Sequence, residues 1–293
     1  MNKIAIIGAT GLIGKPVTQE LIAAGFDITI IARDVGKAKL YFPNQKIVYA
    51  NLDDKKSLIA ALKDHQSLYL SIHINQKTNK KEFICETDGL INLLEVAKNI
   101  GIKRIAYLSS TIKNFQTRSC STWWVFAAKQ KAVQLIKGSG IPYTIFYPSC
   151  FMDSLERNRL LTGGNNINIF GKSNQKIFWI SAQDFGKQVV KSFKVLTDEN
   201  REYQIQGFDA HTYKEAVEVF KSYYIKKPLI IIKMPMGILR LLGKGSTKFN
   251  FVYHIAEAIN KHPQKFDAQF TWDELGKPTE TLKDFTIRIQ EKA

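Results

Sequence analysis

Short apolar segments alternate with helix-like segments along the first half of this chain. The apolar segments are rich in β-branched side chains, which is typical of buried strands. They lie at residues 4–7, 28–32, 46–50, 68–72, 105–109 and 144–147. The segments between them repeat apolar residues every three or four positions, as Leu90, Leu93, Leu94 and Ala97 do, which predicts helices. The alternation predicts an α/β fold in which a doubly wound parallel sheet is covered by helices on both faces.

The pattern changes after Pro148. We expect strands near residues 176–180 and 203–205, helices from about Ala182 and over 213–224, a Gly/Asn-rich turn at 163–166 and a largely helical tail to Arg288. Residues 1–150 are therefore predicted to form the core. Residues 151–293 are predicted to supply the remaining sheet elements, interleaved with a smaller, mostly helical substrate-side cap.

One apolar segment of the second half, residues 229–242, allows more than one interpretation. Lys233, Pro235 and Arg240 interrupt it, and it is shorter than the roughly 20 residues that cross a bilayer. We interpret it as part of the cap core. A lid over the site and a basic membrane-surface helix are the alternatives.

A glycine-rich loop follows the first predicted strand. In IAIIGATGLIG, Gly8 allows a tight turn, Gly11 lets a ligand approach the backbone, and Gly14 lets the next helix pack closely on the strand. Free N–H groups at the start of that helix favour a pyrophosphate. We therefore predict that residues 1–150 form a Rossmann-type core that binds a nicotinamide dinucleotide. The loop residues expected to contact the cofactor are Gly8, Thr10, Gly11, Leu12, Ile13 and Gly14.

The end of the second predicted strand indicates which dinucleotide is bound. An acidic residue there would accept hydrogen bonds from the adenosine ribose, as in NAD-binding proteins, but this chain has Arg33. A guanidinium can bind a 2′-phosphate through two hydrogen bonds, and Lys37 adds charge nearby. We therefore favour NADP(H) over NAD(H). In the alternative interpretation Asp34 binds the ribose hydroxyl.

The amino-acid composition indicates which binding partners and which cellular compartment to expect. The chain has 42 Lys and Arg against 26 Asp and Glu, which gives a net charge of +16. Because the lysines are dispersed and the sequence has no Arg-rich helix, nucleic acid is not the expected partner. Cys85, Cys120 and Cys150 lack metal-ligand spacing, and no metal site is expected. With no signal peptide or membrane-spanning segment in the pattern, we expect a cytoplasmic protein.

Several of these segments resemble the atypical short-chain dehydrogenase/reductases, in particular their NmrA-like and isoflavone-reductase-like branch. GATGLIG and ARD match its opening, and SGIPYTIFYPSCFMD at 139–153 is its other specific element. Weaker matches lie at 50–58, 101–110, 178–187 and 272–285. The resemblance runs along most of the chain and implies an extended Rossmann sheet, bound NADP(H) and a variable C-terminal cap around the substrate.

The resemblance also implies roles for individual residues. Asn51 stands where the family has an adenine-facing Asp, followed by Leu52. Pro148 and Ser149 would run past the nicotinamide. Ser110 or Thr111 would hydrogen-bond a substrate carbonyl. Lys129 matches the lysine of the YxxxK element, which holds the nicotinamide ribose, but Val125 replaces its tyrosine.

Val125 leaves the reaction open, because valine cannot protonate a developing alkoxide. The first hypothesis is an NADP(H)-dependent reductase that transfers hydride to a small carbonyl, enone or quinone, with Lys129 or water as the acid or with an acceptor that needs little acid help. The second is a non-catalytic redox-sensing regulator with a protein partner. Sugar-nucleotide epimerisation or dehydration is a weaker third.

Other side chains have a structural and a functional interpretation. Trp123, Trp124 and Phe126 either wall a pocket for a flat, apolar substrate or pack in the core. His73 is interpreted as a loop residue rather than an acid. Tyr107 and Tyr147 are interpreted as core side chains.

Overall fold

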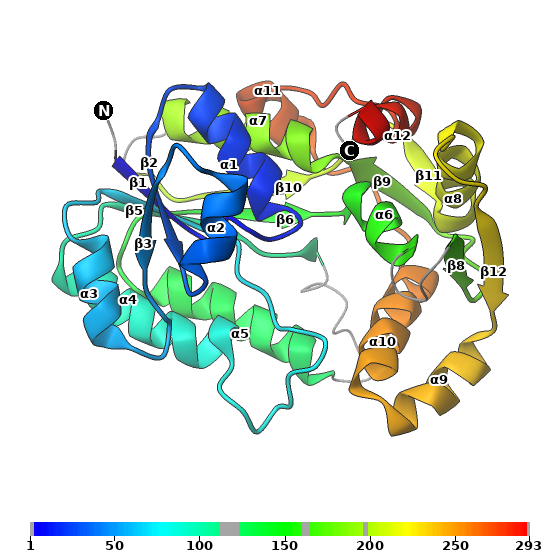
Figure 1. The fold of residues 1–293 in the computed structure, drawn as a ribbon, viewed down its shortest axis with the longest axis horizontal. Helices are drawn as coiled ribbons and strands as arrows, with labels where there is room; N and C mark the ends of the chain where they lie inside the picture. Colours follow the sequence, from blue (N-terminus) through cyan, green and yellow to red (C-terminus); the bar gives the residue numbers. More distant parts are fainter. Residues whose placement is uncertain (1–2, 112–122, 160–164, 196–198, 292–293) are drawn as a thin grey trace.

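A seven-stranded parallel sheet forms the centre of the molecule in the computed structural model, which describes residues 3–111, 123–159, 165–195 and 199–291 (Figure 1). In spatial order the strands are β3 (Lys46–Tyr49), β2 (Asp27–Ala32), β1 (Lys3–Ile7), β4 (Ser67–Leu70), β5 (Arg104–Leu108), β6 (Tyr143–Pro148) and β10 (Arg201–Ile205). The predicted doubly wound α/β sheet is confirmed. Its strand order reverses between β1 and β4, which is where such sheets bind ligands.

The strand register brings the ends of these strands to one edge. Ile7 at the end of β1 pairs with Ile31 of β2 and with Leu70 of β4. Gly8, Arg33 and Ser71, which follow these strands, therefore lie along the same edge of the sheet. The carboxyl edge of a parallel sheet is the usual place for a nucleotide.

Helices cover both faces, each with its own apolar core. One face carries α1 (Gly14–Ala23), α7 (Ala182–Val195) and α11 (Gln269–Leu275), and the other carries α3 (Lys55–Leu62), α4 (Leu90–Asn99) and α5 (Trp124–Gly138) (Figure 1). Ile4 and Ile6 of β1 pack on the first layer, while Ala5 and Ile7 pack on the second. This alternation follows from the two-residue repeat of a strand. Helix α2 (Val35–Tyr41) follows β2 at the edge of the sheet.

The second half of the chain adds smaller sheets. One has the order β11 (Ala210–Thr212), β9 (Lys176–Ile180), β7 (Cys150–Phe151), and the other pairs β12 (Ile230–Met234) with β8 (Asn166–Phe170). The helices here are α6 (Asp153–Arg159), α8 (Tyr213–Tyr223), α9 (Met236–Gly245), α10 (Thr247–Lys261) and α12 (Leu282–Glu291). Their apolar core includes Trp179, Phe220 and Phe285.

The structure of this half differs from the expectations in three details. Asn166, expected in a turn, begins β8, whereas residues 163 and 164 lie outside the described ranges. The tail is largely helical, as expected, with α9, α10, α11 and α12, but the β-branched run at Ile230 forms the unexpected strand β12 beside β8. The segment 229–242 is core only in part: Leu229 and Leu239 are buried, but the outer side of α9 is exposed.

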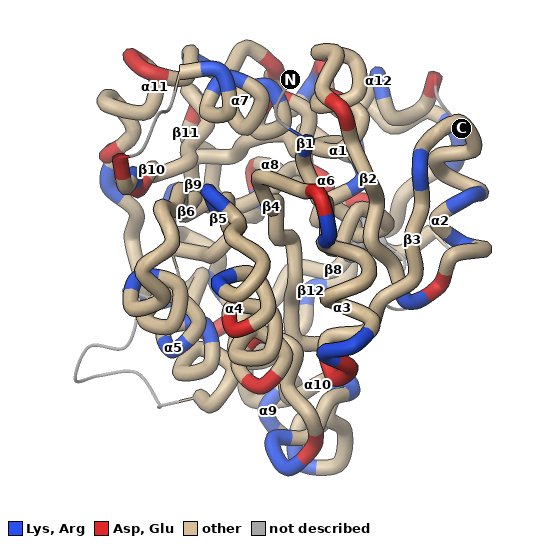
Figure 2. The backbone as a smooth tube through the Cα atoms, turned by 90° about the vertical axis from the view of Figure 1, so that its left-hand side faces the viewer, with Lys and Arg blue, Asp and Glu red and all other residues tan. Residues whose placement is uncertain are grey.

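Figure 2 shows basic and acidic positions interspersed along the helices and loops around the sheet. Within the described ranges, no helix is both long enough and apolar enough to span a bilayer.

Candidate functional site

The glycine loop is shaped by contacts that exclude side chains. Gly8 has a φ of +93°, and a Cβ there would lie 2.2 Å from the carbonyl oxygen of Ser71. A Cβ on Gly14 would lie 2.0 Å from the Gly8 carbonyl oxygen, which accepts the Gly11 N–H at 3.0 Å. No side chain caps the start of α1 at Ile13. The Lys15 N–H donates to the Gly11 carbonyl at 3.0 Å, and Pro16 has no N–H. Among the described residues of the first turn, the Gly14 N–H is therefore the one available to an anion at the sheet edge.

Arg33 and Lys37 flank the neighbouring strand end. The Arg33 side chain is exposed directly after β2, and Lys37 is exposed in the first turn of α2. Asp34 caps α2, its Oδ1 accepting the Lys37 N–H at 2.8 Å. Because this carboxylate oxygen already serves the helix, Arg33 is the better placed of the two residues to meet a ligand at the edge.

Asn51 and Leu52 lie between β3 and α3, at the same edge. The Asn51 N–H donates to Ser57 Oγ at 3.1 Å, and the Leu52 carbonyl accepts a hydrogen bond from Asn92 Nδ2 at 3.0 Å. The side chain of Leu52 packs on Gly89, where a Cβ would meet it at 2.8 Å. The loop that the resemblance places beside adenine is thereby fixed to α4.

Lys129 forms an ion pair with Glu86, a residue that the sequence analysis did not single out. Lys129 Nζ contacts Glu86 Oε1, and the Tyr107 hydroxyl donates to the same oxygen at 3.4 Å. The side chain of Glu86 is 0% exposed and that of Lys129 is 17% exposed. Glu86 Oε2 has no hydrogen-bond partner among the described residues. A carboxylate so deeply buried depends on this cation, because an unpaired buried charge is costly.

Glu86 could have been found from helical spacing. It precedes Leu90, Leu93 and Ala97 at intervals that place it on the buried side of α4, where an acidic residue is unexpected. It lies in a π-helical turn, η1 (Cys85–Gly89), and such turns are frequent at functional sites. The interpretation of Tyr107 as a core side chain is confirmed, and its hydroxyl partner is this carboxylate.

Neighbouring groups at this edge have defined partners. The Cys85 thiol donates to the His73 carbonyl at 3.2 Å, and burial raises the pKa of Cys85 to about 11, so the group stays a thiol. The side chain of His73 is exposed, in agreement with the loop interpretation. Tyr147 is also buried, with its hydroxyl 2.6 Å from Glu202 Oε2.

A hydrogen bond joins the segments that follow β5 and end β6. Thr111 Oγ1 donates to the Pro148 carbonyl at 3.0 Å, and Ser110 is half-buried next to it. The Ser149 N–H donates to the Ile205 carbonyl at 2.9 Å, while Ser149 Oγ donates to Gln264 Oε1. These contacts hold the residues expected near the nicotinamide against the second half of the chain.

Val125 is buried in an apolar cluster between α5 and α10. The cluster contains Ile74, Trp123, Phe126 and Ala258. The Trp123 ring stacks on His254 at 4.8 Å between centroids and meets the Phe251 ring edge-on at 4.9 Å. Position 125 therefore contributes packing rather than a proton donor. Trp123 and Phe126 are buried, which agrees with the interpretation that they pack in the core.

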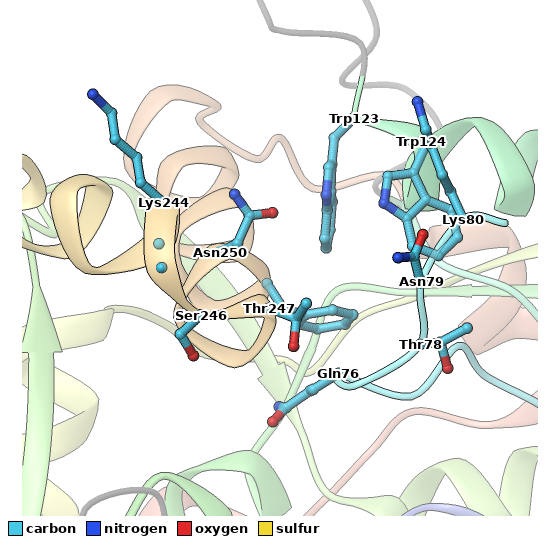
Figure 3. Close-up of a pocket in the computed structure, with 13 residues that line it drawn as sticks. Gln76, Thr78, Asn79, Lys80, Trp123, Trp124, Lys244, Ser246, Thr247 and Asn250 are labelled. Carbon is cyan, nitrogen blue, oxygen red and sulfur yellow. The ribbon is translucent and has the colours of Figure 1, made fainter. Parts of the chain in front are cut away.

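The aromatic residues also border a cavity of about 390 Å³, in line with the other interpretation. Trp123 and Trp124 lie on one side of it, and Asn250 and Thr247 face them from α10 (Figure 3). A more apolar cavity of about 280 Å³ adjoins α10 and shares Gln76 and Phe251 with the first. Such concave, partly aromatic surfaces suit small organic molecules.

No three His, Cys, Asp or Glu side chains converge as metal ligands in the part of the chain that the structure describes. His211 instead contacts Asp209 at 2.7 Å, and His254 Nδ1 lies 3.8 Å from Glu257 Oε2. Cys85 and Cys150 are free thiols, and Cys120 lies outside the described residues.

Comparisons with known proteins agree with this architecture. Phenylcoumaran benzylic ether reductase IRL1 of Ginkgo biloba is 28% identical over 278 residues, covering 88% of this chain and 87% of that protein. Among solved structures, a nucleoside-diphosphate-sugar epimerase from Staphylococcus aureus superposes with a TM-score of 0.77 at 17% identity, over 98% of this chain and 100% of that one. The Citrobacter sp. triphenylmethane reductase complexed with NADP(H) gives 0.74 at 18% identity, over 98% and 99%.

The match to a family covers nearly the whole sequence. Residues 1–279 match the NmrA-like family, so the expected relationship is confirmed, and the glycine loop, the parallel sheet and Lys129 all fall within the matched region. This chain belongs to the NmrA-like family.

Proposed function

We propose that this protein is an NADP(H)-dependent reductase that transfers hydride to a small, flat acceptor, namely a carbonyl, enone or quinone. The observation that carries the proposal is the Lys129–Glu86 pair, an ammonium held by a buried carboxylate that also accepts a hydrogen bond from Tyr107 of β5. Reductase activity in the Ginkgo relative and NADP(H) in the Citrobacter structure support the same assignment.

The residues at the edge fit the proposed cofactor. The uncapped start of α1 would bind the pyrophosphate, with Thr10, Leu12 and Ile13 around it. Arg33 and Lys37 would bind the 2′-phosphate. Asn51 and Leu52 would border the adenine, and Pro148 and Ser149 the nicotinamide. Residues 1–150 would thus hold the cofactor, while residues 151–293 complete the substrate side.

Lys129 would supply the proton that tyrosine supplies elsewhere in the family. When bound, the cofactor supplies two electrons as hydride, which adds to the acceptor carbon. Lys129 Nζ then gives a proton to the acceptor oxygen and regains one from solvent. Glu86 holds the ammonium in place. Of the two expected hydroxyls, Ser110 would donate to the acceptor oxygen, because the single hydroxyl hydrogen of Thr111 is donated to the Pro148 carbonyl. The cavity beside Trp123 and Trp124 would receive the flat ring of the acceptor.

Cofactor binding is tested by thermal shift with NADPH, NADP⁺, NADH and NAD⁺. We expect the largest shift with the 2′-phosphorylated forms, and we expect Arg33→Asp to remove that preference. Lys39→Asp makes the same charge change on α2, away from the strand end, and should keep the preference. No shift with any dinucleotide would contradict the proposal. A preference for NADH would contradict only the role of Arg33.

Turnover is tested by NADPH oxidation with a panel of quinones, enals and ketones. We expect activity that is lost in Lys129→Ala. Val125 favours a second candidate, a redox-sensing regulator, which predicts unequal affinity for NADPH and NADP⁺ and a co-purifying protein without oxidation of any acceptor. Sugar-nucleotide epimerisation remains the weakest candidate, because it relies on the tyrosine that Val125 replaces.

A further inference from the structure

Helix α9 has an aliphatic side that faces away from the described parts of the chain. Ile238, Leu241 and Leu242 are 52%, 66% and 39% exposed. Their spacing of three and four residues places them on one side of the helix. Leu239 and Gly243 are buried toward α10, so α9 is anchored by its inner side. Figure 1 shows α9 at the end of the molecule remote from β3.

The Asp, Glu, Lys and Arg positions in the sequence around this helix are all basic. Between Glu218 and Glu257 there is no acidic residue, while seven cationic ones occur, at Lys221, Lys226, Lys227, Lys233, Arg240, Lys244 and Lys248. This stretch is about an eighth of the sequence, yet it supplies 7 of the 16 net positive charges. Glu257, which ends it, contacts Lys261 at 2.7 Å. Arg240 and Lys244 are exposed on α9 itself.

We propose that α9 docks this protein on an anionic lipid surface. The aliphatic side chains would enter the boundary between headgroups and acyl chains, and Arg240 and Lys244 would extend to lipid phosphates. Each Lys or Arg near such a surface strengthens binding roughly fivefold at ordinary salt. Contact with a second copy is disfavoured, because a two-fold interface here would bring two exclusively basic segments together.

The docked helix adjoins the cavity of the proposed site. Gly243, Lys244 and Gly245 at the end of α9 line the cavity that Trp123 and Trp124 border. An acceptor dissolved in the bilayer would therefore reach the cavity from the docked side. This part of the inference rests on the proposed reductase function, whereas docking itself does not.

The test is flotation of the full chain with vesicles of phosphatidylcholine, alone or mixed with phosphatidylglycerol. We expect binding only to the mixed vesicles, with a loss as salt rises. Ile238→Ser/Leu241→Ser and Arg240→Glu/Lys244→Glu should each weaken it by about tenfold or more. Leu40→Ser is the matched control, since Leu40 is 83% exposed on α2, and it should leave binding unchanged.

Three results would overturn the docking proposal. The first is that the parent protein does not float with anionic vesicles, and the second is that all variants bind the vesicles equally. The third is that light scattering shows a dimer that Ile238→Ser/Leu241→Ser dissociates. Thermal shift with NADPH on the same variants separates this proposal from the proposed function. A variant that loses vesicles but keeps its NADPH response supports docking, and it leaves the reductase assignment intact.

Discussion

The buried ion pair between Lys129 and Glu86 makes a prediction about stability that is independent of any ligand. Lys129→Ala leaves the Glu86 carboxylate, 0% exposed, with the Tyr107 hydroxyl at 3.4 Å as its remaining hydrogen-bond partner among the described residues. Removing one partner of a buried pair costs about 3–5 kcal/mol. Because Lys129 is 17% exposed, some water reaches the pair, and we expect the lower end, about 3 kcal/mol, or roughly 6 °C in Tm.

The carboxylate, rather than lost packing, should cause this destabilisation. Glu86→Gln removes the buried charge, and the Lys129 ammonium it leaves can turn toward water, so we expect a cost of about 1 kcal/mol. Lys129→Ala/Glu86→Gln should then be more stable than Lys129→Ala alone, with a coupling free energy of about 2 kcal/mol. Lys131→Ala, at an exposed position on the same helix, should cost no more than about 0.5 kcal/mol.

Urea unfolding without dinucleotide, followed by tryptophan fluorescence, measures all four variants. The reasoning fails if Lys129→Ala costs less than about 1 kcal/mol, or if the double variant is no more stable than Lys129→Ala. Either result would mean that the Glu86 carboxylate does not depend on Lys129 in the folded protein, and the ammonium would then lack the fixed position that the proposed function requires.

Three further predictions concern the glycine loop and two carboxylates. Gly14→Ala would place a Cβ 2.0 Å from the Gly8 carbonyl oxygen, so it should destabilise the fold by about 2 kcal/mol or more and abolish the thermal shift with NADPH. Burial raises the pKa of Asp153 to about 6, so its contribution to stability is present below pH 4 and is lost as the pH rises through 6. In urea unfolding, the unfolding free energy of Asp153→Asn should match that of the parent at pH 4 and exceed it by about 2 kcal/mol at pH 7. Asp184 Oδ2 accepts the N–H groups of Thr279 and Glu280, both at 2.8 Å, so Asp184→Ala should lower the unfolding free energy by about 2–3 kcal/mol, whereas exposed Asp273→Ala should leave it nearly unchanged.

The parts of the fold that could be predicted are those that local pattern determines. A β-branched run such as Ile28 to Ile31 forms a strand because its neighbours on both sides are apolar strands as well. The glycine loop was equally accessible, because the steric requirements at Gly8 and Gly14 arise within a few residues of the turn. Residue type and spacing determine local geometry of this kind, so it can be predicted from the sequence.

The features that escaped prediction depend on distant segments. Helical spacing marks Glu86 as a buried acidic residue, but its pairing with Lys129, 43 residues along the chain, became visible only in the fold. The strand β12 forms beside β8, about 60 residues earlier in the chain, and the apolar run alone did not indicate that pairing. The outer side of α9 looked like core because periodicity shows which side of a helix is apolar, but not whether anything covers it.

Val125 and Glu86 are best understood together. In the family pattern the lysine acts beside a tyrosine, whose hydroxyl it makes more acidic. Here position 125 fills an apolar cluster with Trp123, and the partner of Lys129 is a carboxylate. A carboxylate fixes and neutralises an ammonium but adds no acidic proton of its own when ionised. Any proton given to an acceptor from this pair must therefore leave through Lys129 Nζ, so the same residue that secures the buried charge is the one on which the proposed turnover depends.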